Sequence, residues 1–191
     1  MVTRTATVQT LVVFAVVAVL QTLAGLVGAG GLFVLGPSSL SEPVTVLVSV
    51  YAHANLGHLL SNSLALLLLG LAVERGTTRL RFHLFFVTTG VLAGLVQVTV
   101  GNLFVAGSAG VLGASGAIFG LLGYLLAGNS VSGSLLSRFD LGRRAQVALF
   151  VVVAGVVTVA TAAPGVALLA HFTGLFVGLI AGRLRLLRVT Q

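Results

Sequence analysis

One serine is surrounded by apolar and small residues in the stretch GASGAIFG, at residues 113–120. A serine hydroxyl becomes a nucleophile when a base can take its proton. His171, which opens the stretch HFTGLFVG at 171–178, is the candidate base for Ser115. The alternative is that Ser115 is only a small residue that lets two helices pack closely, which is the commoner role of an isolated serine in a membrane helix.

A second polar group lies in the stretch HANLGHLLSN at residues 53–62. His58 and Asn62 are four residues apart, so on a helix they share one face, and His53 precedes them at the mouth of that helix. An imidazole N–H and a side-chain amide can both donate hydrogen bonds to a developing oxyanion. The alternative is that these residues join neighbouring helices through interhelical hydrogen bonds.

The elements that position these residues are predicted to be membrane-spanning helices. The chain has 191 residues, 58% hydrophobic and 7% charged, with a mean hydropathy of +1.19. A water-soluble domain of this length needs far more charge to cover its surface. Segments without Asp, Glu, Lys or Arg are long enough for spans of roughly 20 residues, and turn-forming residues divide the two longest of them. This pattern predicts an all-α membrane protein, one domain over 1–191, with six helices at about 7–29, 57–74, 83–101, 114–128, 145–162 and 167–186.

The basic residues are all arginines, and they account for the net charge of +7. They lie at the N-terminus, at 75–82, at 137–144 and in the C-terminal tail, whereas the loops between these regions hold none. With six spans, every arginine falls on one side of the membrane, which the positive-inside rule makes cytoplasmic together with both termini. The charge therefore predicts a topology and a contact with the lipid bilayer, and gives no support to nucleic-acid binding.

The first apolar segment is longer than the apolar core of a signal peptide, so we expect it to be retained as the first helix. The chain has no cysteine, which excludes disulfides and thiolate metal sites. The absence of lysine with abundant Ala, Gly and Val suggests a GC-rich prokaryotic genome, and hence the plasma membrane.

Two glycine stripes are predicted to bring Ser115 and His171 together. One stripe consists of Gly116, Gly120 and Gly123 on the fourth helix, and the other of Gly174, Gly178 and Gly182 on the sixth. Helices with such faces can approach until their backbones touch. Ser115 and His171 each lie near the outer end of their helix, so we expect a hydrogen bond between them.

The ordered set of motifs resembles the rhomboid intramembrane serine proteases, whose core is a six-transmembrane-helix bundle. The family's H-x-x-x-N, G-x-S-G and H-x-x-G-x-x-x-G motifs read here as HLLSN (58–62), GASG (113–116) and HFTGLFVG (171–178). The preceding YAHANLGH and the following LAVERG also fit, with a structural role expected for Glu74. The resemblance extends over roughly residues 45–185.

The resemblance implies a role for each candidate residue. Ser115 is expected to be the nucleophile and His171 the general base of a dyad without a carboxylate. His58 and Asn62, with the Ser115 amide, are expected to form the oxyanion hole, supported by His53 and by Gly113 of the G-x-S-G motif. Phe119 occupies the position of an aromatic residue on which the catalytic histidine stacks. The expected substrates are transmembrane segments of other proteins, cleaved near the extracytoplasmic side without a cofactor or metal ion.

The chain departs from many family members in its first loop, which lacks their Trp-Arg pair because 30–52 holds no arginine and the chain has no tryptophan. Two other functions are compatible with parts of the sequence. One is a catalytically inactive rhomboid relative that binds membrane proteins, although such relatives typically lose the serine or the histidine. The other is a small transporter or channel with buried polar residues in its path. His83, beside two arginines, is expected to be an interfacial residue without a catalytic role.

Overall fold

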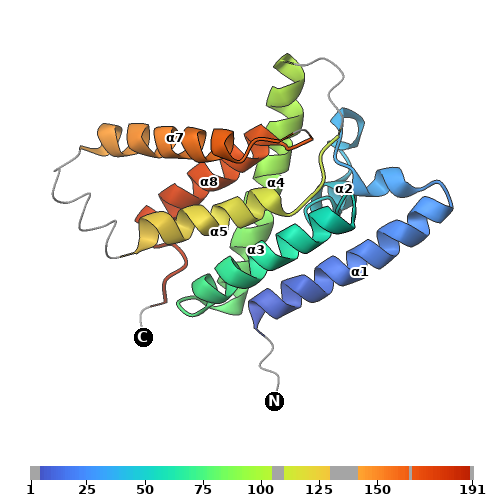
Figure 1. The fold of residues 1–191 in the computed structure, drawn as a ribbon, viewed down its shortest axis with the longest axis horizontal. Coiled ribbons are helices and arrows are strands. Elements are labelled where there is room, and N and C mark those ends of the chain that lie inside the picture. Colours follow the sequence, from blue (N-terminus) through green and yellow to red (C-terminus); the bar gives the residue numbers. More distant parts are fainter. Residues whose placement is uncertain (1–4, 105–109, 130–141, 164, 190–191) are drawn as a thin grey trace.

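The structure, a computed structural model, describes residues 5–104, 110–129, 142–163 and 165–189 of the chain (Figure 1). The described part is helical. Its long helices are α1 (Ala6–Leu26), α3 (Leu56–Glu74), α4 (Arg79–Phe104), α5 (Ser115–Gly128), α7 (Arg143–Ala160) and α8 (Leu168–Arg183). These correspond in order to the six predicted spans, so the predicted all-α fold class is confirmed.

Several helix ends differ from the prediction: α1 ends at Leu26 rather than at 29, α4 ends at Phe104 rather than at 101, and α7 spans Arg143–Ala160 rather than 145–162. Two further differences have local reasons. Helix α4 begins at Arg79 rather than at 83, since the Thr78 hydroxyl accepts a hydrogen bond from the Arg81 amide (3.3 Å) and so caps the first turn. Helix α8 ends at Arg183 rather than at 186, because Arg185 adopts a left-handed backbone conformation (φ 54°) that stops the helix. Apolar composition thus predicts that a membrane-spanning helix exists, whereas local capping hydrogen bonds and backbone conformation determine the residue at which the helix begins or ends.

The outer loop between α1 and α3 forms short helical elements that the sequence did not predict. These are η1 (Gly30–Phe33), η2 (Pro37–Ser39) and α2 (Pro43–Val48). Leu35 in this loop exchanges two backbone hydrogen bonds with Val111 (2.9 and 2.8 Å), and the Ser49 carbonyl accepts one from the Gly113 amide (2.9 Å). The first loop is therefore joined to the segment that leads into α5.

The closest interhelical contact is between α5 and α8, which lie side by side with α4 packed against both (Figure 1). A Cβ atom at Gly174 would overlap the carbonyl oxygen of Gly116, and one at Gly178 would overlap that of Gly120. The two backbones therefore touch directly, as the two glycine stripes predicted.

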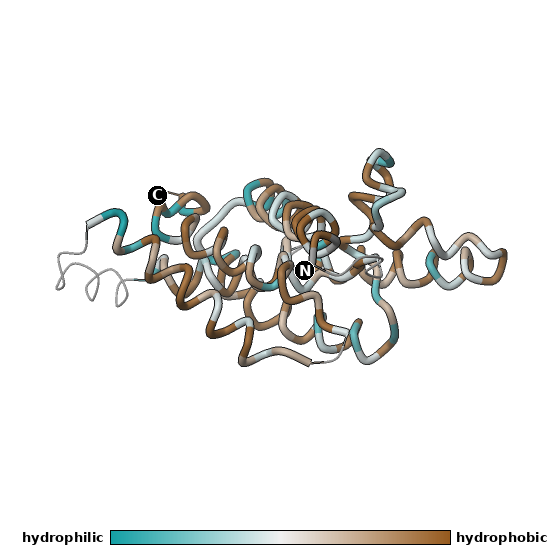
Figure 2. Tube along the Cα trace, turned by 90° about the horizontal axis from the view of Figure 1, so that it is seen from above, coloured by the Kyte–Doolittle hydropathy of each residue, from teal (hydrophilic) through white to brown (hydrophobic). Residues whose placement is uncertain are grey.

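Aromatic and aliphatic side chains fill the rest of the interior, and the outer faces of the helices are also apolar. Phe14, Phe82, Phe86, Leu66 and Leu121 are fully buried among α1, α3, α4 and α5. In contrast, Val159 on α7 is 72% exposed and Leu68 on α3 is 66% exposed. Hydrophobic segments run along most of the helices (Figure 2).

Four of these helices, α1, α3, α4 and α7, are long and apolar enough to cross a membrane, and α5 and α8 are shorter apolar helices. A bundle with apolar residues outside as well as inside fits a multi-pass membrane protein.

The arginine-bearing helix ends lie together at one end of the bundle. Glu74 accepts hydrogen bonds from the amide (2.9 Å) and the hydroxyl (2.8 Å) of Thr7, which fastens the start of α1 to the end of α3. The Val189 amide donates to the Gly76 carbonyl (3.1 Å), and the Arg183 Nε donates to the Gln146 side chain (2.9 Å). Glu74 thus has a structural role, as expected from the sequence.

The contact between α5 and α8 predicts a strong effect of one added methyl group. Gly178→Ala should lower the free energy of unfolding by about 2 kcal/mol, because the Cβ would meet backbone atoms that cannot rotate away. Thermal unfolding in detergent micelles measures this difference. The control is Gly155→Ala on α7, where a Cβ would have no neighbour within 4 Å, so its stability should be unchanged or slightly higher. Equal stability of the two variants would contradict the close backbone contact.

Candidate functional site

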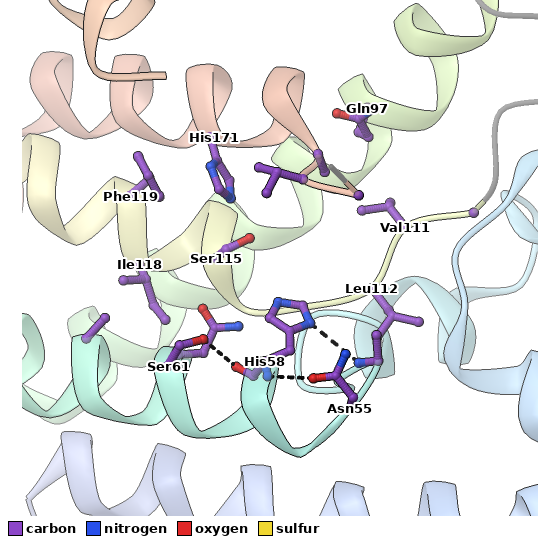
Figure 3. Close-up of a pocket in the computed structure, with 17 residues that line it drawn as sticks. Asn55, His58, Ser61, Gln97, Val111, Leu112, Ser115, Ile118, Phe119 and His171 are labelled. Atoms are coloured by element: carbon purple, nitrogen blue, oxygen red, sulfur yellow. Dashed lines mark hydrogen bonds between the residues drawn. The ribbon is translucent and has the colours of Figure 1, made fainter. Parts of the chain in front are cut away.

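The predicted polar residues meet at a pocket of about 790 Å³ at the end of the bundle opposite the arginines. Helices α3, α5 and α8 all begin at this end, so three helix starts surround the pocket (Figure 3). The polar side chains that line it are Asn55, His58, Ser61, Asn62, Gln97, Ser115 and His171.

Ser115 is the first residue of α5, with Ala114 as the N-cap. The first intrahelical bond of α5 runs from the Ile118 amide to the Ala114 carbonyl (3.0 Å). The amides that precede Ile118 therefore have no acceptor within the helix, and the positive end of the helix dipole lies beside the serine. This environment favours a negative charge close to Ser115.

His171 extends from the first turn of α8 into the same pocket, facing the Ser115 side (Figure 3). Its ring stacks on Phe119, one turn after Ser115, with centroids 4.1 Å apart and an interplanar angle of 19°. His171 is 8% exposed, and its Nδ1 is buried without a hydrogen-bond partner among the described residues. The hydrogen bond expected between Ser115 and His171 is not formed among the described residues, although both residues line the same pocket.

His58 lines the pocket, and its Nε2 is free to donate there because its Nδ1 accepts a hydrogen bond from the backbone. Asn55 caps α3 by accepting the His58 amide (2.9 Å), and the Ala54 amide donates to the His58 Nδ1 (3.4 Å). An accepting Nδ1 places the proton of the neutral ring on Nε2, so Nε2 is a donor. A Cβ at Gly113 would lie 2.6 Å from the Cε1 and 2.9 Å from the Nε2 of this ring, and Gly113 has a φ of 130°. Glycine is therefore required at this position both by the space and by the backbone conformation.

Asn62 and His53 differ in how they relate to the pocket. Asn62 lines it, is 6% exposed, and has a side-chain nitrogen without a hydrogen-bond partner in the described part of the chain. His53 does not line the pocket but lies behind His58, with ring centroids 5.2 Å apart and an edge-on angle of 77°. On its other side His53 contacts the ring of Phe14 (4.8 Å). His53 and Gly113 thus support His58, whereas Asn62 faces the cavity itself.

Gln97 is a pocket residue that sequence reasoning missed. It lies in the last third of α4, and its Oε1 accepts a hydrogen bond from the amide of Ala170, the residue directly before His171 (3.2 Å). Gln97 therefore fixes the first turn of α8, where backbone amides lack intrahelical acceptors. The available signal was a polar amide within an apolar span, the same signal that singled out Asn62.

A potential metal site is absent from the described residues, because no three His, Asp or Glu side chains lie together there. The pocket instead combines a hydroxyl, an imidazole and several hydrogen-bond donors. Together these groups make the pocket a candidate hydrolytic site within a helical membrane bundle.

The chain belongs to the rhomboid family: the model of the Rhomboid domain matches residues 40–188. It is also similar to RHOMBOID-like protein 4 of Arabidopsis thaliana, with 30% identity over 138 residues. That alignment covers 72% of this chain and 33% of the plant protein, so the chain spans about a third of the length of this curated relative.

The position of His53 predicts a pH dependence of stability. Burial, with a smaller contribution from the neighbouring His58, lowers the pKa of His53 from 6.5 to about 4. Between these values the unfolded chain binds a proton at His53 that the folded chain does not, so stability is complete above about pH 6.5 and falls as the pH decreases towards 4. His53→Phe keeps an aromatic ring beside Phe14 and removes this titration, so its melting temperature should fall less between pH 7.5 and 5. An equal fall in both proteins would contradict a neutral buried His53.

Proposed function

We propose that this protein is an intramembrane serine endopeptidase that cleaves transmembrane segments of other membrane proteins. The observation that carries the proposal is the convergence of Ser115, His171, His58 and Asn62, from three helix starts, on one pocket. Membership of the rhomboid family supports it.

In the proposed mechanism the Ser115 hydroxyl attacks the carbonyl carbon of a substrate peptide bond, while the His171 imidazole takes the hydroxyl proton. The tetrahedral intermediate then breaks its C–N bond, and His171 returns the proton to the leaving amine. Water attacks the resulting acyl-enzyme in the same way, with His171 again accepting and returning a proton. No carboxylate lines the pocket among its described residues, so stacking on Phe119 would hold the imidazole in place.

The oxyanion of the intermediate would be stabilised by donors that are already positioned. The amides at the start of α5 and the dipole of this helix favour negative charge beside Ser115. The His58 Nε2 and the Asn62 side-chain amide supply two further donors. A buried amide without a partner is costly, and an oxyanion would satisfy it. Donors that are fixed before reaction need no reorganisation when the charge develops.

Substrate chemistry follows from the location of the pocket. A transmembrane helix hides its carbonyls in internal hydrogen bonds, so a substrate must unwind locally before attack. In a substrate, the cleavage region should therefore contain residues that weaken a helix, at the depth in the membrane where the pocket lies. We also propose that both termini are cytoplasmic by the positive-inside rule, which puts the pocket near the extracytoplasmic face.

The proposal predicts that Ser115→Ala abolishes cleavage of a transmembrane substrate in proteoliposomes, with a loss of about a thousandfold or more. Labelling by a fluorophosphonate should disappear in Ser115→Ala and in His171→Ala, because the probe needs an activated serine. Ser61→Ala is the matched control, since Ser61 also lines the pocket but donates its hydroxyl to the His58 carbonyl (3.0 Å). Cleavage by Ser115→Ala at the wild-type rate would reject the nucleophile, and an unlabelled wild type would favour an inactive membrane-protein binder.

The stacked ring pair predicts a smaller effect. Phe119→Leu should slow fluorophosphonate labelling by roughly three- to tenfold, because an aromatic pair contributes about 0.5–1.5 kcal/mol and its loss frees the imidazole to rotate. Phe172→Leu on α8 is the control, since Phe172 stacks on Phe176 (6.0 Å) and does not line the pocket. Equal labelling rates in the two variants would show that stacking does not position His171.

A further inference from the structure

A second cavity, of about 880 Å³, lies at the arginine-bearing end of the bundle. Its walls come from the turn between α3 and α4 and from the segment after α8, which are more than a hundred residues apart in sequence. The Val189 amide donates to the Gly76 carbonyl (3.1 Å), and the Arg81 Nη1 donates to the Arg188 carbonyl (2.8 Å). The two walls are thus held together by hydrogen bonds that leave the Arg188 side chain out.

Three exposed arginines, Arg75, Arg185 and Arg188, line this cavity together with Thr77 and Thr78, and no acidic residue is among its described lining. Of the described carboxylates, Glu74 is engaged by Thr7, and Glu42 accepts a hydrogen bond from Thr45 (3.0 Å) in the outer loop. Like charges gathered in one cavity repel each other. An anion between them would remove this repulsion and accept charge-assisted hydrogen bonds.

Arg185 occupies a backbone position that favours glycine. Its amide donates to the Gly182 carbonyl (3.0 Å), and the Leu186 amide donates to the Ala181 carbonyl (3.0 Å), which together form a Schellman motif with Arg185 at the left-handed position (φ 54°). Glycine adopts this conformation without strain, whereas an arginine does not. A cation at the end of α8 interacts favourably with the helix dipole, but glycine would avoid the strain, so the choice of arginine is explained further if its side chain serves the cavity.

The start of α4 adds to the attraction for an anion. Thr78, which caps α4, lines the cavity, so the positive end of the helix dipole lies beside the arginines. Next to the cationic cavity, apolar side chains remain exposed: Leu184 by 59%, Leu186 by 56% and Leu80 by 67%. A free phosphate ion would make no contact with these side chains, whereas the acyl chains of a phospholipid bound in the cavity would pack on them.

We propose that Arg75, Arg185 and Arg188 bind the phosphate-bearing headgroup of an anionic phospholipid, whose acyl chains lie on the neighbouring leucines. The arginine guanidinium groups pair with phosphate oxygens in bidentate geometry. This site lies at the opposite end of the bundle from Ser115, and its occupation does not depend on catalysis.

The test is a lipid titration of the detergent-purified full-length protein, followed by native mass spectrometry. Dioleoylphosphatidylglycerol should bind the wild type, whereas dioleoylphosphatidylcholine should bind weakly or not at all. Arg188→Gln and Arg185→Gly should each weaken phosphatidylglycerol binding about fivefold, the effect of roughly one basic residue at a membrane surface. Arg144→Gln is the control, because Arg144 is an equally exposed arginine at the start of α7 that does not line the cavity.

Arg185→Gly separates binding from folding, because its two expected effects have opposite signs. Without lipid its melting temperature should rise, since glycine relieves the left-handed backbone, while its affinity for phosphatidylglycerol falls. Equal weakening in Arg144→Gln would show a general effect of surface charge and would overturn the site. Stabilisation of the wild type by inorganic phosphate alone, with no further gain from phosphatidylglycerol, would overturn the lipid as the ligand.

Discussion

Direct contact between the backbones of α5 and α8 is the constraint on which the site depends. Where Gly174 meets Gly116 and Gly178 meets Gly120, no side chain separates the helices, so the distance between their axes is set by main-chain atoms, which cannot change rotamer. Ser115 opens one of these helices and His171 lies in the first turn of the other. A fixed axial distance therefore becomes a fixed distance between a hydroxyl and an imidazole. Glycine lowers intrinsic helix propensity, and the close contact, with its dispersion energy, compensates within the bundle.

The pocket shows how polar groups are accommodated where the surrounding protein is apolar. The His171 Nδ1 and the Asn62 side-chain nitrogen are buried without partners in the described part of the chain, although most buried polar atoms in proteins are hydrogen-bonded. Both belong to residues that line a cavity of about 790 Å³, which is large enough to hold water. Other members of the site are held by fully formed contacts: Asn55 fixes the His58 amide, Gln97 the start of α8, and Phe119 the imidazole plane. Fixed supports around unsatisfied polar atoms are the arrangement expected of a preorganised site.

Sequence patterns predicted those features that depend on composition and spacing. The six long helices followed from apolar runs. The two glycine stripes led us to expect Ser115 and His171 near each other, and both line one pocket, but the expected hydrogen bond between them is not formed in the described residues. Features that depend on local hydrogen bonding were not predicted. The pairing of Leu35 with Val111 joins segments far apart in sequence, and no periodicity encodes it. Gln97 stands out in the sequence as a polar amide within an apolar span, but its bond to the Ala170 amide of a distant helix is not encoded in any local pattern. The left-handed Arg185 was unpredictable, since arginine carries no signal for that conformation.

The length of α5 has a consequence for the membrane around the protein. At 14 residues and 1.5 Å per residue, the helix is about 21 Å long, whereas the hydrocarbon layer is about 30 Å thick. With its far end at the arginine-bearing face, α5 stops well short of the opposite headgroups. Above the start of α5 the structure has the pocket and the loop between α1 and α3, which pairs with Val111, instead of a further turn of helix. Ser115 is the first residue of this helix, so water that reaches the serine must enter through the pocket, from the end of the bundle opposite the arginines.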